Sequence, residues 1–165
     1  MSGSDFEMLL PRLRRFARCL LCERELADDV VCESLEEVFE SRRGVSLTLV
    51  ETELLLFRAV IDGGRKHSAG TARAAGATEI DDSGETVDPM RRAVVQLSFD
   101  ERAVIGLHVL EGFSLDDTAH MIGDSRAHAR EHLDNARTRL AHLVKMMEKL
   151  GAANPDASGS RAFIC

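Results

Sequence analysis

The hydrophobic residues of the first 62 positions recur at intervals of three and four, with almost no alternation of apolar and polar residues. This spacing predicts amphipathic helices over residues 5–21, 25–41 and 48–62, each with one buried side. The apolar stripe of the first helix consists of Phe6, Leu9, Leu10, Leu13, Phe16, Ala17 and Leu20. The expected buried residues of the next two are Leu26, Val30, Val31, Leu35, Val38, Phe39, Leu49, Val50, Leu54, Leu56, Phe57, Val60 and Ile61. The pair Gly63-Gly64 is predicted to end the third helix.

The periodic pattern stops between His67 and Pro89, where Gly, Ala, Ser, Thr and Asp predominate. We therefore expect an all-α protein of two small helical domains, residues 5–66 and 90–149, joined by a flexible linker over 67–89. The last residues, 150–165, have no apolar face and are predicted to form a disordered tail.

Local signals divide the second domain into short helices. Ser98 with Glu101 forms a capping-box pattern, and Gly112 is a predicted helix stop. Ser114 with Asp117 resembles a second box, and Gly123 interrupts the chain before a long periodic segment resumes at Ser125. A short helix, a glycine-containing turn and a longer helix are typical of a helix-turn-helix, whose second helix enters the DNA major groove.

The charge balance modifies this picture. The net charge is −7 and the sequence pI is about 5.4, whereas binding to the nucleic-acid backbone needs Lys and Arg. A local basic face remains compatible with DNA binding, but the acidic balance favours a protein partner. Four arginines of the first helix lie off its apolar stripe, where they either face solvent or contact a partner: Arg12, Arg14, Arg15 and Arg18.

Other classes of function find little support. No apolar run reaches the roughly 20 residues that span a bilayer, and the N-terminus lacks a secretory signal pattern, so we expect a cytoplasmic protein without membrane contact. Cys19, Cys22 and Cys32 lack a second CxxC pair, and His128 with His132 lacks a third ligand. We expect neither a metal nor another cofactor, and no enzymatic activity.

Two regions of the chain, one in each predicted domain, resemble one protein family. The C-terminal stretch is LEGFSLDDTAHMIG at residues 110–123, followed by Leu133 and by ARTRL at 136–140. The N-terminal stretches are LPRLRRFAR at residues 10–18 and ADDVVCESL at 27–35. They resemble, in the right order, the two domains of bacterial sigma factors of the extracytoplasmic-function type, or the sigma-like part of alphaproteobacterial general stress response regulators.

The resemblance implies partners and contact residues. In that family the acidic second helix binds RNA polymerase core, which here implicates Asp28, Asp29 and Glu33. The helix-turn-helix binds promoter DNA, and an anti-sigma factor is an expected further partner. The residues expected to contact DNA are Ser125, Arg126, His128, Ala129, Arg130 and Arg137.

Three functional hypotheses remain open. The sequence favours a transcription initiation factor that binds RNA polymerase core and promoter DNA. The alternative is a sigma-mimicking module that sequesters an anti-sigma factor; the acidic balance and the charges of Glu131 and Asp134 on the expected recognition helix suit this reading. An ordinary helix-turn-helix regulator ranks last, because it leaves the N-terminal resemblance unexplained.

Overall fold

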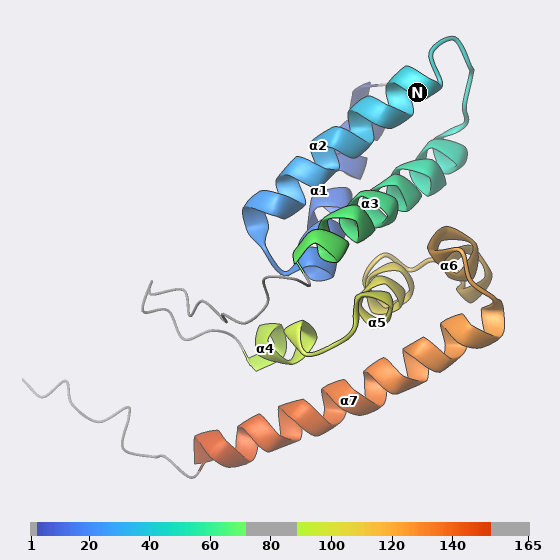
Figure 1. The fold of residues 1–165 in the computed structure, drawn as a ribbon. Helices are drawn as coiled ribbons and strands as arrows, with labels where there is room; N and C mark the ends of the chain where they lie inside the picture. The colour runs from blue at the N-terminus through green and yellow to red at the C-terminus, as the bar shows by residue number, and fades with distance from the viewer. Residues whose placement is uncertain (1–2, 72–88, 153–165) are drawn as a thin grey trace, which may run out of the picture.

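The computed structural model describes residues 3–71 and 89–152, and every regular element within these ranges is a helix (Figure 1). The all-α prediction is confirmed for this part of the chain. The elements are α1 (Gly3–Leu21), α2 (Arg24–Ser41), α3 (Leu49–Thr71), α4 (Pro89–Val95), α5 (Phe99–Val104), the π-helix η1 (Ile105–Leu110), α6 (Leu115–Ile122) and α7 (Arg126–Ala152).

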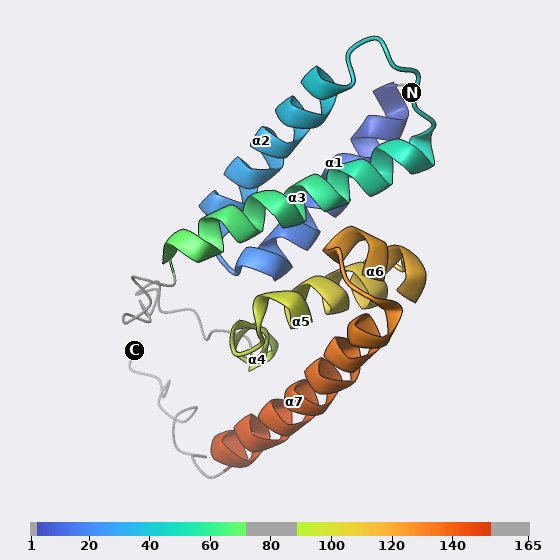
Figure 2. The ribbon, with the colours of Figure 1, turned by 45° about the vertical axis from the view of Figure 1, so that its right-hand side comes forward.

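Helices α1, α2 and α3 pack against one another and form the N-terminal half, residues 3–71 (Figures 1 and 2). The 3.6-residue period of α1 brings Leu13, Phe16 and Leu20 to one side, where all three are fully buried. Thr48 begins α3 as predicted: its hydroxyl accepts the Glu51 N–H at 3.2 Å, and its own N–H donates to the Glu51 carboxylate at 2.9 Å.

Three predicted core residues are instead exposed. Phe39 is 47% exposed, Leu49 42% and Val50 63%. They lie at the end of α2 and the start of α3, on either side of the loop 42–48 that joins the two helices. A periodic pattern marks the side of a helix that faces the core, but it does not indicate how far along the helix its neighbours extend.

The prediction that Gly63-Gly64 ends the third helix is wrong, because α3 continues to Thr71. The two glycines allow close packing instead. A Cβ atom added to Gly63 would lie 3.1 Å from Val30, and one added to Gly64 would lie 3.3 Å from Leu20, Leu21 and Phe99. The first residues of the predicted linker, 67–71, are consequently helical, and Pro89 already belongs to α4.

The rest of the predicted linker, residues 72–88, lies outside the described residues, as does most of the predicted tail. Residues 150–152 of that tail are helical.

Helices α4 to α7 form the C-terminal half, residues 89–152, and their local start and stop signals are confirmed. Ser98 and Glu101 form the capping box: the Ser98 N–H donates to the Glu101 carboxylate at 2.7 Å, and the Glu101 N–H donates to the Ser98 hydroxyl at 3.3 Å. The Ser114 hydroxyl caps α6 by accepting the Asp117 N–H at 3.1 Å. Gly123 ends α6 in the left-handed region at φ 73°. The π-helix η1 was not predicted from the sequence.

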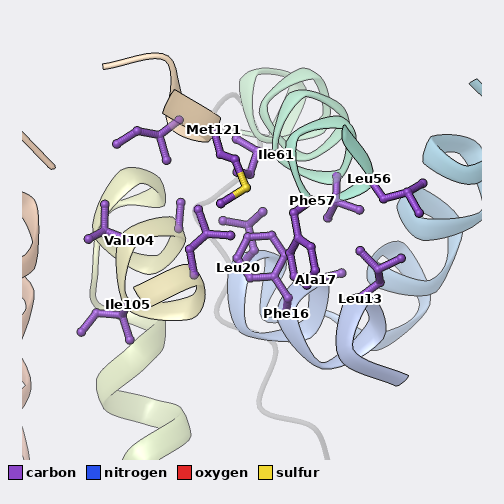
Figure 3. Close-up of a cluster of buried hydrophobic side chains, with 14 of the residues drawn as sticks. Leu13, Phe16, Ala17, Leu20, Leu56, Phe57, Ile61, Val104, Ile105 and Met121 are labelled. Carbon is purple, nitrogen blue, oxygen red and sulfur yellow. The ribbon is translucent and has the colours of Figure 1, made fainter. Parts of the chain in front are cut away.

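The two halves share one hydrophobic core. Phe57 of α3 contacts Phe16 of α1 and Phe113 of the loop before α6, with ring centroids 5.2 and 5.0 Å apart. Met121 of α6 is buried in the same cluster, opposite Ile61 of α3 (Figure 3). Gly106 of η1 lies against the Phe16 ring so closely that a Cβ atom there would come within 2.7 Å of it. The boundaries of two independently folding domains stay a prediction, but the described halves pack directly together.

Candidate functional site

The predicted polymerase-binding residues lie on the side of α2 that faces away from the core, in different electrostatic surroundings. Asp28 is paired within the chain, with its carboxylate 3.1 Å from Arg18 and 3.8 Å from Arg14. Asp29 is exposed. The Glu33 carboxylate lies 3.5 Å from the His67 Nε2 atom of α3. Only part of this acidic charge is therefore left for an outside partner.

The arginines of α1 have an explanation that the sequence did not suggest. Arg14 and Arg18 bind Asp28 of the next helix, while Arg12 and Arg15 bind Glu111 of the C-terminal half. All four bind carboxylates of the chain while their side chains stay 35–56% exposed, so the two readings given above, a solvated face or a partner contact, both stay open.

Five of the six predicted DNA-contacting residues lie between Ser125 and Arg130, at the start of α7, and Arg137 lies about two helical turns further along the same helix. Ser125 caps α7, because its hydroxyl accepts the His128 N–H at 3.2 Å. Arg126 pairs with Asp116 of α6 at 3.4 Å. Arg130 and Arg137 are exposed and make no ion pair within the described residues. These two remain the arginines best placed for contact with phosphate.

Ala129 does not share this exposed side. Its side chain is fully buried in the core that joins α7 to the rest of the C-terminal half, so it packs internally in place of facing DNA. Arg139 of the same helix is likewise engaged within the chain, since it donates to the Glu101 carboxylate at 2.9 Å and to the Gln96 carbonyl at 3.2 Å. The helical surface available for DNA is therefore smaller than the sequence suggested.

Asp124, in the turn between α6 and α7, is the carboxylate nearest to two histidines of α7. Its carboxylate lies 2.8 Å from His128 Nδ1 and 3.8 Å from His132 Nε2. The hydrogen bond to Asp124 raises the pKa of His128, and the same bond lowers the pKa of Asp124. Because the pKa of His128 is higher in the folded protein, its bond to Asp124 stabilises the fold fully at pH values below 6.5, the pKa of an unfolded histidine. This stabilisation is lost as the pH rises through the folded pKa. The pKa of Asp124 is lower in the folded protein, so this carboxylate stabilises the fold fully at pH values above 3.8, the pKa of an unfolded aspartate, and less as the pH falls. The ion pair therefore stabilises the fold most between about pH 3.8 and pH 6.5.

We expect Asp124→Asn to lower the pKa of His128, because the asparagine amide carries no charge to favour the imidazolium. The measurement is an NMR titration of the His128 ring protons in both proteins, with His142, an exposed histidine of α7, as the internal control. An unchanged His128 pKa in the variant would contradict the assignment of this shift to Asp124.

The structure also contains a pocket that sequence reasoning missed. It has a volume of about 290 Å³ and lies between α3 and α6, so residues from both halves line it. We call it the α3–α6 pocket; its lining residues are Arg42, Leu47, Glu51, Leu54, Leu55, Arg58, His120 and Met121. Two smaller pockets, of about 190 and 160 Å³, adjoin it and share Arg42 with it. One feature of the sequence could have indicated this pocket: the apolar residues of α3 cover more than one side of the helix. In the structure, the additional residues Leu54 and Leu55 are only partly buried.

The described residues show little that would suggest chemistry. They contain no group of three metal-ligating side chains. Burial, with a further contribution from Cys22, raises the pKa of the Cys19 thiol to about 11, which disfavours the reactive thiolate. None of the helices in the described part of the chain is long and apolar enough to cross a membrane.

Comparison with known proteins agrees with this geometry. Residues 6–60, which span α1, α2 and much of α3, match the family model of the sigma2 domain of PhyR. No curated protein sequence matches the chain significantly.

Two solved structures share the fold. The first is the co-crystal structure of the sigma factor RpoE in complex with the anti-sigma factor NepR from Bartonella quintana. The similarity covers 86% of this chain and 95% of that chain, with 24% identity and a TM-score of 0.64. The second is the NMR structure of the PhyRSL–NepR complex from Sphingomonas sp. Fr1, with 23% identity, 87% and 90% coverage and a TM-score of 0.61. The predicted resemblance is thereby confirmed: the chain is sigma-like in fold, and its residues 6–60 match the sigma2 domain of PhyR, a sigma-like domain of alphaproteobacterial stress response regulators.

Proposed function

We propose that this chain is a sigma-like interaction module that binds and sequesters an anti-sigma factor. The observation that carries the proposal is the α3–α6 pocket, to which both halves contribute lining residues. Both solved chains of the same fold come from complexes with the anti-sigma factor NepR, which supports a partner of this class. This proposal reverses the order of preference that the sequence suggested.

The chemistry of the pocket fits an amphipathic helix. Leu47, Leu54, Leu55 and Met121 supply apolar surface. Arg42 and Arg58 are the basic residues of the pocket, of which Arg58 also lies 3.8 Å from the Asp62 carboxylate, and Glu51 adds a carboxylate. A helix with an apolar stripe and acidic flanking residues would complement such a groove, as in other helix-in-groove complexes.

The surface of α7 also favours an anti-sigma-binding module over a DNA-binding sigma factor. Of the six residues expected to contact DNA, Ala129 is buried, while Arg126 and His128 are paired with carboxylates of the chain itself. The exposed residues Arg130 and Arg137 lie on either side of Glu131 and Asp134 along the same helix. Since phosphate contacts supply most of the affinity for DNA, this surface is poorly charged for the purpose.

A working sigma factor is the second candidate, and the acidic side of α2 favours it. Asp29, Glu33 and Glu36 are exposed there, in the segment that matches the sigma2 domain. In this role the chain would bind RNA polymerase core through α2 and promoter DNA through α7, with Ser125 and Arg130 among the contact residues.

Two binding measurements on the full chain discriminate these functions. We expect a one-to-one complex with the NepR homologue of the same organism. Its dissociation constant should be micromolar or lower, which corresponds to a binding free energy of about −8 kcal/mol or more negative. Burial of apolar surface should give the association a negative heat-capacity change in calorimetry. We expect no retention of the chain on immobilised RNA polymerase core. Retention there, with promoter-dependent transcription, would favour the sigma factor, and absence of the NepR complex would reject the proposal.

A further inference from the structure

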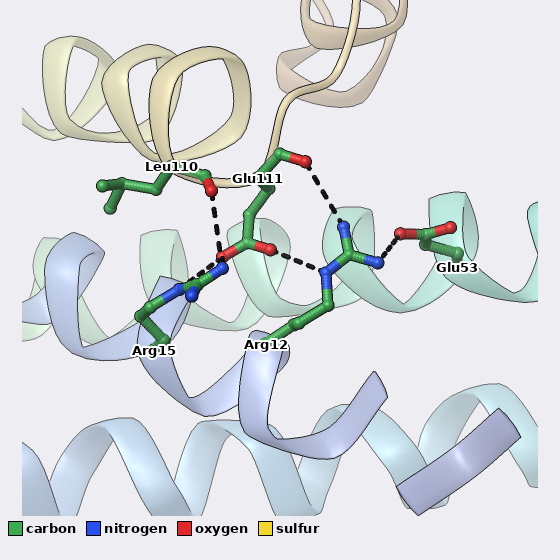
Figure 4. A network of polar contacts seen from close by, with 5 residues as sticks. All are labelled: Arg12, Arg15, Glu53, Leu110 and Glu111. Carbon is green, nitrogen blue, oxygen red and sulfur yellow. Dashed lines mark hydrogen bonds and ion pairs between the residues drawn. The ribbon is translucent and has the colours of Figure 1, made fainter. Parts of the chain in front are cut away.

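The contact between the two halves includes a cluster of buried charge. The Glu111 carboxylate, with none of its side chain exposed, accepts hydrogen bonds from Arg12 Nε at 2.9 Å and from Arg15 Nε and Nη2 at 3.0 and 2.8 Å (Figure 4). Arg12 also pairs with Glu53 of α3, so three helical elements meet at one guanidinium. We call these four residues, Arg12, Arg15, Glu53 and Glu111, the Glu111 cluster.

Aromatic contacts extend this cluster along the chain. The Arg12 guanidinium carbon lies 5.7 Å from the centre of the Phe57 ring and 6.0 Å from that of Phe113. Phe57 and Phe113 meet edge to face. The segment from Glu111 to Phe113 thus binds the N-terminal half twice, through its carboxylate and through its aromatic ring.

Two departures from regular α-helix, the π-helix η1 and the positive φ of Gly112, direct the segment from Glu111 to Phe113 towards α1. In η1 the Glu111 N–H bonds to the Gly106 carbonyl at 3.0 Å, five residues back, in place of the four of an α-helix. The extra residue turns Glu111 by roughly 100° relative to an uninterrupted α-helix, because each residue of an α-helix advances 1/3.6 of a turn. Gly112 follows at φ 78°, where a side chain would be strained, and reverses the chain towards α6.

The free energy needed to separate the two halves is lower with charged groups at this contact than it would be with apolar groups of the same size, because the charged groups regain water when the halves part. Arg12 and Arg15 are already 35% and 56% exposed, and Glu111 would gain full hydration if the halves parted. A buried ion pair often contributes little net stability, yet removal of one partner leaves an uncompensated charge at considerable cost. Such a contact therefore specifies one arrangement strongly while remaining reversible.

We propose that the Glu111 cluster is a latch that holds the two halves in the closed arrangement and thereby controls whether α6 completes the α3–α6 pocket. The segment 111–114 leads directly into α6, which contributes His120 and Met121 to that pocket. Release of Glu111 from Arg12 and Arg15 would remove the contact between α1 and the segment that leads into α6. Arg65 of α3, which donates to the Ile122 carbonyl at 2.9 Å, would then be a polar contact that still joins α3 to α6. The effect on partner binding rests on the proposed function, whereas the effect on the arrangement of the halves does not.

The first experiment measures the free chain by small-angle X-ray scattering. We expect Glu111→Gln, which removes the charge but keeps the size, to increase the radius of gyration while the far-UV circular dichroism stays that of a helical protein. Arg15→Gln, at a half-exposed position, should give a smaller increase and carries the test if the first variant does not fold. Asp28→Asn is the matched control for scattering: its carboxylate also binds two arginines of α1, but within the N-terminal half. Its dimensions should equal those of the wild type.

The second experiment titrates the same proteins with the NepR homologue of the same organism. If Glu111→Gln leaves about a tenth of the molecules closed, the apparent dissociation constant should rise about tenfold, since only the closed fraction binds. Unchanged dimensions in folded Glu111→Gln and Arg15→Gln variants would overturn the latch. Expansion without a change of affinity would overturn its control of the pocket. If the wild type does not bind NepR, the proposed function fails, and the scattering result still decides the latch.

Discussion

Replacing Phe57 with alanine should lower the free energy of unfolding by about 3–5 kcal/mol, the usual range for a buried phenylalanine. Phe57 is fully buried, and its ring contacts Phe16 of the same half and Phe113 of the other. The substitution would leave a cavity where the two halves meet, and Arg12 would lose the aromatic face beneath it.

Urea unfolding followed by circular dichroism measures this loss, with Phe39→Ala as the matched control. Phe39 lies on α2, is 47% exposed and packs its ring against Phe6 at 6.0 Å between centroids, so its truncation should lower the unfolding free energy by only about 0.5–1.5 kcal/mol. Equal losses in the two variants would show that the shared core contributes less to stability than its burial indicates.

Replacing Leu54 with aspartate should weaken binding of the NepR homologue by about 2–4 kcal/mol, the range of a central interface residue. Leu54 lies on α3 and lines the α3–α6 pocket. An aspartate there would present a carboxylate to the apolar stripe of the partner helix, where burial of an unpaired charge is unfavourable. It would also oppose the acidic flanks that Arg42 and Arg58 are expected to attract.

Isothermal titration calorimetry of folded protein provides the measurement, and Val95→Asp is the control. Val95 ends α4, is 43% exposed and lies outside the residues that line the α3–α6 pocket. The control should bind as the wild type does. Wild-type affinity in a folded Leu54→Asp variant would mean that the partner binds elsewhere on the chain.

Much of the local structure follows from short-range chemistry that a sequence displays directly. The hydroxyls of Thr48, Ser98 and Ser114 accept N–H groups three residues on, and Gly123 takes the left-handed conformation that ends α6. Each of these interactions involves neighbours along the chain, so residue type and spacing suffice to predict them. The buried side of α1 was predictable for the same reason.

The candidate surfaces were less predictable, because they depend on residues distant in sequence. Arg12 and Arg15 read as free charges until the fold brings Glu111 to them from a position 96 or 99 residues later. Ala129 was expected at a DNA-binding surface and is buried because α7 packs against the rest of its half. The α3–α6 pocket has no counterpart in any single helix.

The sequence by itself determined the helical class, most helix ends and the likeness of its N-terminal and C-terminal motifs to sigma proteins, since these depend on periodicity, caps and motif spacing. Only the tertiary structure decided which glycines end a helix and which allow close packing: Gly63 and Gly64 face Val30, Leu20 and Phe99 across the core. It also decided which charges are already paired within the chain, as Glu111 is with Arg12 and Arg15. The physical reason is that packing distance and charge pairing are properties of two surfaces in contact, and a linear pattern describes only one of them.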